Sequence, residues 1–342
     1  MKLIKIKSYP VKNMEKNKVY LGDSLEIIRT FPDNSIDCVV TSPPYYGLRD
    51  YGVDGQIGLE ETPEKYIQRL VELFREIRRV LKKDGTIWVN IGDSYAAQRG
   101  GSYQPAESLA GGEHGRTKDG KKTNRGRGDC YNPTRNAEAI GLKHKDLIGI
   151  PWMLAFALRA DGWYLRQDII WHKPNPMPES VTDRCTKSHE YIFLLSKSEK
   201  YYFDYKAIQE DAVCVNDRRA GRGRFEYNGK HMAGGGTKQT LSVQRSFVTI
   251  TDKRNKRDVW SVNVRPNKEA HFATFPEALI APCILAGCRE NGIVLDPFMG
   301  SGTTGIVARK LNRNYIGCEL NPEYHQMSER RIWDEGENLF TI

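Results

Sequence analysis

The amino-acid sequence predicts an α/β fold in which a mostly parallel sheet is covered by helices on both faces. Short β-branched apolar runs alternate along the chain with segments whose apolar residues recur at helical spacing. The apolar runs are nearly continuous, which is typical of strands buried on both faces of a parallel sheet. With 342 residues, the chain is long enough for one large domain with an inserted module or for two domains.

The first predicted elements are a strand, a helix, a strand, a longer helix and another strand. The longer helix has the clearest start, because Thr62 is a suitable N-cap, Pro63 fits the first helical position and Glu64 is an early acid. Gly85 is expected to stop it. The other predicted ranges are strand 19–21, helix 23–31, strand 36–41 and strand 86–91.

Two long polar segments, 98–145 and 212–257, then interrupt this alternation. Both are rich in Gly and Arg and poor in apolar residues, so we expect both to be mobile in the free protein and neither to bring a large core of its own. The remaining predicted elements are helix 146–160, strands 164–171 and 191–195, helix 276–288, strand 293–296, helix 303–311, strand 315–319 and helix 322–333.

Positive charge is concentrated in the same two segments. The chain carries 52 Lys and Arg against 43 acidic residues, a net charge of +9. Range 217–257 has eleven basic and three acidic residues, and range 99–127 has seven and three. Such clusters suit a polyanionic partner, because each Lys or Arg that neutralises a phosphate releases counterions. A pair of solvated loops is the alternative explanation.

Several protein classes are excluded by composition. No apolar run reaches the roughly 18 residues that a bilayer span requires, and the basic N-terminus has no apolar core of signal-peptide type. We therefore expect a cytoplasmic protein without a membrane partner. The seven cysteines are scattered and form no CxxC pair, so we expect neither disulfides nor a metal site.

A glycine-rich turn follows the predicted strand that ends at Asp296. The stretch from Gly300 through Gly302 to Gly305 opens a helix, where glycine lets a ligand approach the backbone closely. A phosphate loop would need Lys at Ile306, so that interpretation fails. A dinucleotide site remains open, since the spacing of the glycines matches and Glu319 stands at a position suited to a ribose hydroxyl.

A second turn, Thr41-Ser42-Pro43-Pro44-Tyr45, follows another buried strand. Ligands bind at the carboxyl edge of open α/β sheets, which is where this turn is expected. The two prolines fix the backbone and withhold two N–H groups, so the carbonyl groups project in a set direction. A stiff loop without chemistry is the alternative to a catalytic turn.

These two motifs resemble those of a known enzyme family. DPFMGSGTT resembles the first motif of S-adenosylmethionine-dependent methyltransferases, and TSPPY resembles the fourth motif of the amino-methyltransferases that act on DNA bases. The order, with the TSPPY motif first, resembles the β-class of that family. The resemblance implies a circularly permuted, Rossmann-like methyltransferase fold with a seven-stranded sheet and an inserted target-recognition segment.

The resemblance also implies a division of the chain and a set of site residues. The catalytic half would be 1–211, with 98–145 as a mobile basic insertion, followed by target recognition at 212–257 and a cofactor-binding half at 258–342. The catalytic residues would be Ser42, Pro43, Pro44 and Tyr45. The residues that bind S-adenosylmethionine would be Asp23, Phe272, Thr274, Phe275, Asp296, Phe298, Gly300, Gly302 and Glu319.

In this chemistry the target base must leave the duplex to be reached. Ser42 Oγ and the Pro43 carbonyl would accept hydrogen bonds from its exocyclic amine, and Tyr45 would stack on its face. Double-stranded DNA is the implied partner, and the residues expected to bind it are Arg218, Arg219, Arg222, Arg224, Lys253, Arg254 and Lys173. Trp171 and Asn175 belong to the same motif as Lys173, and Asp93 is expected at the same sheet edge.

The resemblance favours a site-specific methyltransferase for the N4 amine of cytosine, because Ser before Pro-Pro-Tyr is commoner in such enzymes. N6-adenine methylation is the alternative, and RNA or protein-amide methylation, a nicotinamide oxidoreductase and a non-catalytic DNA-binding module are more remote. Carbon-5 methylation needs a Cys nucleophile, but Cys283 stands within a predicted helix. A cognate restriction endonuclease is a candidate partner, and both a monomer and a homodimer are compatible with the sequence.

Overall fold

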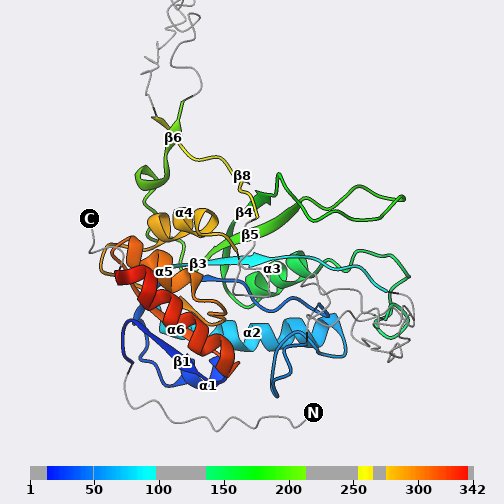
Figure 1. Ribbon diagram of the computed structural model, residues 1–342, viewed down its shortest axis with the longest axis horizontal. Helices are drawn as coiled ribbons and strands as arrows, with labels where there is room; N and C mark the ends of the chain where they lie inside the picture. Colours follow the sequence, from blue (N-terminus) through cyan, green and yellow to red (C-terminus); the bar gives the residue numbers. More distant parts are fainter. Residues whose placement is uncertain (1–13, 49, 98–135, 213–252, 265–274, 338–342) are drawn as a thin grey trace, which may run out of the picture. The chain divides into compact units, whose positions relative to one another are not determined.

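The computed structural model describes residues 14–48, 50–97, 136–212, 253–264 and 275–337 (Figure 1). The chain divides into two compact units. One combines Met1–Asp204 with Arg257–Ile342, and the other is Tyr205–Lys256. All the residues of the cavity described below belong to the first unit.

The described part of the first unit is built on an eight-stranded sheet with the order β1-β10-β9-β2-β3-β5-β4-β8. Strand β5 is antiparallel to both of its neighbours, and the other pairs are parallel. The strands are β1 (Lys18–Leu21), β2 (Ile36–Thr41), β3 (Leu81–Ile91), β4 (Tyr164–His172), β5 (His189–Ser196), β8 (Val259–Ser261), β9 (Ile293–Asp296) and β10 (Asn314–Glu319). The predicted α/β fold with a mostly parallel sheet is confirmed.

One strand exceeds the seven that the resemblance implied. The additional strand, β8, has three residues and pairs with β4 in parallel through Trp260 and Trp171. Only Trp260 is buried among its three residues, so the segment carries almost no apolar pattern from which a strand could be predicted. The Trp171 indole donates a hydrogen bond to the carbonyl of Val262, 2.9 Å away, which fastens the segment to the sheet.

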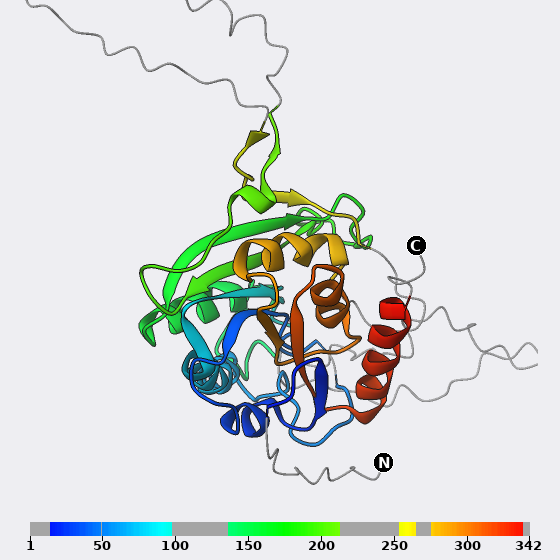
Figure 2. The same ribbon diagram turned by 90° about the vertical axis from the view of Figure 1, so that its left-hand side faces the viewer.

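Helices cover both faces of the sheet (Figure 2). On one side are α1, α2 and α3, and on the other are α4, α5 and α6. Their bounds are α1 (Ser24–Arg29), α2 (Pro63–Val80), α3 (Ile150–Ala160), α4 (Glu277–Gly287), α5 (Thr303–Lys310) and α6 (Pro322–Glu337).

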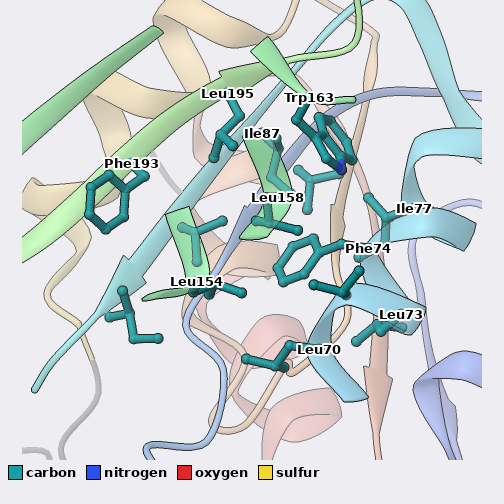
Figure 3. Packing of buried hydrophobic residues seen from close by; sticks show 14 of the residues in the cluster. Leu70, Leu73, Phe74, Ile77, Ile87, Leu154, Leu158, Trp163, Phe193 and Leu195 are labelled. Atoms are coloured by element: carbon teal, nitrogen blue, oxygen red, sulfur yellow. The ribbon is translucent and has the colours of Figure 1, made fainter. Parts of the chain in front are cut away.

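Helix α2 begins as the sequence predicts. The side chain of Thr62 accepts a hydrogen bond from the Lys65 N–H at 3.3 Å, and Pro63 is the first helical residue. The helix ends at Val80 rather than near Gly85, because Leu81 takes an extended backbone and starts β3. Leu70, Phe74 and Ile77 on its buried face pack with Leu154 and Leu158 of α3 and with strand residues such as Ile87, as Figure 3 shows.

The second unit is small where the structure describes it. A short 3-10 helix, Lys206–Ile208, precedes an antiparallel pair of two-residue strands, β6 (Glu210–Asp211) and β7 (Lys253–Arg254). Across all the described ranges, none of the helices combines the length and apolar character needed to cross a membrane.

Candidate active site

The two predicted turns meet at one edge of the sheet. Strands β2 and β9 are parallel neighbours, with Val39 opposite Leu295, so the turns that follow them leave the sheet at the same edge. The Thr41 hydroxyl at the end of β2 donates a 2.7 Å hydrogen bond to Asp296 Oδ1 at the end of β9. This hydrogen bond joins the C-terminal ends of two strands that lie about 255 residues apart in sequence.

A cavity of about 300 Å³ opens at this edge, and both turns line it. Its volume lies at the lower end of the range for small-molecule sites, about 300–1,000 Å³. One half is formed by the turn after β9, the end of β10 and the start of α6. The other half is formed by the turn after β2 and by residues of β3, β4 and β5.

Glu319 is the acid of the first half. Its side chain lines the cavity, yet the residue is only 9 % exposed. Its two carboxylate oxygens accept 2.8 Å hydrogen bonds from the Gly300 and Asn321 N–H groups. Burial nevertheless raises the pKa of Glu319 to about 7, because desolvation of the carboxylate outweighs these hydrogen bonds.

The glycines of this turn have different tasks. Gly300 lines the cavity with a positive φ of 52°, and a Cβ there would meet only a carbonyl oxygen 3.9 Å away, so its backbone faces open space. Gly302, with φ of 86°, does not line the cavity. A Cβ on Gly302 would come within 3.1 Å of the Ser328 backbone, which shows that this glycine allows α5 and α6 to pack closely.

Asp296 lies behind the cavity wall rather than on it. It is 1 % exposed, and its carboxylate accepts hydrogen bonds from the hydroxyls of Thr41 and Thr304 and from the Phe298 N–H. Burial raises the pKa of Asp296 to about 6 in spite of these three donors. The contacts tie the catalytic turn, the glycine turn and helix α5 together.

Two other acids near this edge cap helices. Asp23 lines the cavity, but its Oδ1 accepts hydrogen bonds from the Leu25 and Glu26 N–H groups and so caps α1. Asp93 accepts from the N–H groups of Gly149 and Ile150 at the start of α3. Asp23 stays a predicted cofactor contact, because it also lines the cavity, whereas Asp93 does not line it.

The catalytic turn forms the wall of the second half. Ser42, Pro43, Pro44 and Tyr45 all line the cavity. The Pro44 carbonyl accepts a 2.8 Å hydrogen bond from the Tyr66 hydroxyl of α2, which fixes the second proline from behind. A Cβ on Gly92 would lie 2.6 Å from the Tyr45 ring, so glycine at this position leaves room for the ring.

The Tyr45 hydroxyl belongs to a network of polar side chains. It donates a 2.7 Å hydrogen bond to Glu190 Oε2, and Asn90 Oδ1 lies 3.4 Å away. Burial and the charge of Glu190 raise the pKa of Tyr45 well above its ordinary value, whereas a hydrogen bond with Ser42 lowers it. Tyr45 is therefore a neutral hydrogen-bond donor at physiological pH.

Lys173 contacts the carboxylate oxygen of Glu190 that Tyr45 does not use. Its ammonium group pairs with Glu190 Oε1 and lies 4.2 Å from the centre of the Trp171 ring. Lys173, Trp171, Asn90 and Glu190 line the same cavity as Ser42. Lys173 was predicted to bind DNA, and the structure places its side chain on the cavity wall, paired with Glu190.

The other predicted residues fall in three groups. Phe275 and Phe298 line the cavity. Lys253 and Arg254 lie in the second unit and pair with Asp211 and Glu210 across the β6–β7 pair. The residues that lie outside the described ranges are Phe272, Thr274, Arg218, Arg219, Arg222 and Arg224. Cys283 is buried within α4, which confirms that it is a helix cysteine.

Sequence reasoning missed Asn90 and Glu190. Each is a polar residue next to the apolar stretch of its strand and on the cavity side, Asn90 near the end of β3 and Glu190 near the start of the antiparallel β5. A polar side chain in such a position is the signal that could have identified them. It becomes usable only when the reversed direction of β5 is known, because that direction brings the start of β5 to the carboxyl edge of the sheet.

The first half of the cavity fits S-adenosylmethionine chemically. Glu319 can accept hydrogen bonds from the two ribose hydroxyls, and the exposed backbone at Gly300 leaves room for a ligand close to the turn. Apolar side chains, among them Phe298, Leu320 and Met327, provide surfaces for an adenine ring. Among the described residues, no group of His, Cys, Asp and Glu is arranged to hold a metal ion.

Comparisons with known proteins show the family to which the chain belongs. The family model described as DNA methylase matches residues 36–330. Type II methyltransferase M.SmaI of Serratia marcescens is 48 % identical over 320 residues, which cover 94 % of this chain and 92 % of that protein. Type II methyltransferase M.Cfr9I of Citrobacter freundii is 45 % identical, with 95 % and 90 % covered.

Two solved structures show the same fold. The PvuII DNA methyltransferase (cytosine-N4-specific) superposes with a TM-score of 0.58 at 19 % identity, covering 96 % of this chain and 94 % of that one. A DNA modification methylase from Thermus thermophilus, described as putative and complexed with S-adenosyl-L-methionine, gives 0.53 at 21 % identity, with 93 % and 95 % covered.

The two motifs, the cavity that joins them and the family match over most of the chain lead to one conclusion. The protein belongs to the DNA methylase family and is an S-adenosylmethionine-dependent DNA methyltransferase of the N4/N6 amino-methyltransferase type.

Proposed function

We propose that this enzyme methylates the exocyclic N4 amine of cytosine in double-stranded DNA, at a base everted into the cavity. The observation that carries the proposal is the shared cavity, which both Ser42 and Gly300 line. Ser42 offers an uncharged hydroxyl where other family members carry an acid or an amide. The fold is shared with a methyltransferase described as cytosine-N4-specific.

In this proposal the protein orients the target base and supplies hydrogen-bond acceptors for its amine. When bound, S-adenosylmethionine provides an electrophilic methyl group on a sulfonium centre. The amine of a nucleobase is a poor nucleophile, because its lone pair is delocalised into the ring. Ser42 Oγ and the Pro43 carbonyl would accept its two N–H groups, localise the lone pair and direct it, and the rest of the catalysis is positioning. Methyl transfer would form an N–C bond as the donor's S–C bond breaks, which would leave S-adenosylhomocysteine, and the nitrogen would release one proton to solvent.

The cofactor half assigns roles to the residues beside it. We place the ribose against Glu319, the turn at Gly300 along the methionine part, and Phe298 and Phe275 at the apolar surfaces. Phe272 and Thr274 remain predicted contacts in the segment before Phe275. Asp296 and Gly302 do not line the cavity, and their proposed role is to fix the turn on which the ligand lies.

In this proposal one residue contacts the everted base, and a separate set contacts the rest of the DNA. Lys173 would contact the everted base, whereas the basic segment 212–257 would read the target site and bind phosphates through Arg218, Arg219, Arg222, Arg224, Lys253 and Arg254. Because Lys253 and Arg254 pair with Asp211 and Glu210, DNA phosphates would compete with these acids for them.

The experiment is methylation of unmodified plasmid DNA by the purified protein, followed by nucleoside mass spectrometry and sequencing of modified positions. N4-methylcytosine at one short site supports the proposal. N6-methyladenine selects the alternative substrate, and DNA without new methyl groups refutes both.

The protein is further proposed to protect that site from a cognate restriction endonuclease. Digestion of the modified plasmid by endonucleases of matching specificity tests this protection. Light scattering distinguishes a monomer from a homodimer.

A further inference from the structure

Glu190 has no role in the mechanism given so far, although it is a largely buried carboxylate beside the catalytic turn. It lies near the start of β5, opposite Trp171 of β4, and its side chain is 15 % exposed. Its Oε1 pairs with the ammonium group of Lys173. Its Oε2 accepts hydrogen bonds from the Tyr45 hydroxyl at 2.7 Å and from the Asn90 amide at 3.3 Å. Three donors from different parts of the chain thus meet at one carboxylate.

This carboxylate is held from both sides of its strand. Strand β5 lies between β3 and β4, and Asn90 belongs to β3 whereas Lys173 directly follows β4. The Asn90 amide also donates to the Tyr191 carbonyl at 3.1 Å, and the Lys173 backbone N–H donates to the Ser188 carbonyl at 2.8 Å. The groups that hold Glu190 are therefore themselves fixed to the sheet.

The contact with Glu190 fixes the far end of the Tyr45 side chain, which belongs to a turn and not to a strand. A tyrosine side chain turns about two bonds. Its hydroxyl lies on the axis of the second bond, so the hydrogen bond to Glu190 restrains the swing of the ring about the first. Rotation about the second is limited by the backbone at Gly92, where a Cβ would lie 2.6 Å from a ring carbon.

We propose that Glu190, supported by Asn90, is a positioning residue that holds the Tyr45 ring in the orientation that receives the everted base. The ring lines the cavity, and an orientation set in advance removes an ordering cost that the base would otherwise have to offset. The proposal rests on the proposed function, because it needs a base to stack on Tyr45. It applies equally to cytosine and adenine, since either base can stack on the ring.

Tyr45→Phe is the direct test, because it keeps the ring and removes only the hydroxyl. We expect the single-turnover rate of methyl transfer at saturating DNA to fall about 10- to 100-fold, the usual cost of losing a hydrogen bond to a charged group. The Kd for S-adenosylmethionine, measured by calorimetry without DNA, should change less than about threefold, because the cofactor half of the cavity is separate. An unchanged transfer rate would overturn the proposal.

Glu190→Asp separates reach from charge. It keeps the negative charge beside Lys173 but withdraws the carboxylate by about 1.5 Å, which breaks the contact with Tyr45. Its transfer rate should fall as in Tyr45→Phe, and the double variant should be no more than about threefold slower than the worse single variant. Losses that multiply would overturn the proposal, since Glu190 would then act independently of Tyr45. If Glu190→Asp does not fold, Asn90→Ala takes its place in the cycle, with the same two outcomes.

Tyr20→Phe provides a matched control. Tyr20 is a buried tyrosine of β1 whose hydroxyl accepts a 2.7 Å hydrogen bond from the Glu15 N–H, and it does not line the cavity. This variant should lose thermal stability and keep the transfer rate per folded molecule. A rate loss equal to that of Tyr45→Phe would overturn the proposal, because it would show a general effect of stability. If wild-type protein transfers no methyl group to DNA, the proposed function fails. If wild type is active and Tyr45→Phe equals it, only the role of Glu190 fails.

Discussion

The pH dependence of cofactor binding is a direct consequence of the burial of Glu319. Burial raises the pKa of this carboxyl from 4.5 to about 7. Only the ionised carboxylate is a pure acceptor for the two ribose hydroxyls, so S-adenosylmethionine should bind preferentially to protein that has lost this proton. Roughly a tenth of the molecules would be ionised at pH 6 and nine-tenths at pH 8, so the Kd should fall about tenfold, or about 1.4 kcal/mol.

Stability of the cofactor-free protein should change in the opposite sense. The pKa of Glu319 in the folded state lies above its unfolded value of 4.5, so the folded state holds more protons between these values. Its contribution to the free energy of unfolding therefore declines as the pH rises from about 4.5 to about 7. Thermal unfolding without cofactor should show this decline, and saturating cofactor should reduce it.

Calorimetric titrations between pH 5.5 and 8.5 at constant ionic strength measure the binding effect. Glu319→Gln is the control, because it removes this titration and leaves that of Asp296, whose pKa is about 6. The variant should bind more weakly at pH 8 and show a nearly flat profile. A flat profile for the wild type, or an equal slope in the variant, would refute the placement of the ribose at Glu319.

Three further outcomes are expected. Tyr45→Ala should lower the kcat for methylation far more than it raises the Kd for cofactor, and equal losses in the two would contradict contact of the ring with the base. Gly92→Ala should lower the kcat at least tenfold with little loss of cofactor affinity, because its Cβ would lie 2.6 Å from the Tyr45 ring; a fully active variant would show that the ring can move without cost. The Kd for DNA should rise about 10³- to 10⁵-fold between 50 and 200 mM salt if six to ten phosphates are contacted, and a flat response would remove the case for the basic segments.

The sequence predicts well those features that depend on local pattern. The apolar strands, the capping of α2 by Thr62 and the two turns after β2 and β9 all follow from residue types and spacing. The meeting of Ser42 with Gly300 also follows, because parallel strands deliver their carboxyl ends to the same edge.

Features that depend on pairing between distant segments could not be predicted in the same way. The motif predicts that Asp296 contacts the cofactor. In the structure Asp296 does not line the cavity, because its carboxylate is turned to the hydroxyls of Thr41 and Thr304. Lys173 was expected to bind DNA, but its ion pair with Glu190 inside the cavity was not predicted. The first outcome depends on the pairing of β9 with β2, and the second on the antiparallel β5, neither of which a local signal reveals.

A crystal structure of the protein with DNA and sinefungin, a stable analogue of the methyl donor, tests the central claim most directly. We expect a cytosine everted into the cavity, its amine nitrogen within hydrogen-bond distance of Ser42 Oγ and the Pro43 carbonyl, and the analogue ribose at Glu319. A target base that stays stacked in the duplex, or an amine that lies away from Ser42 while the analogue occupies the Gly300 turn, would contradict it.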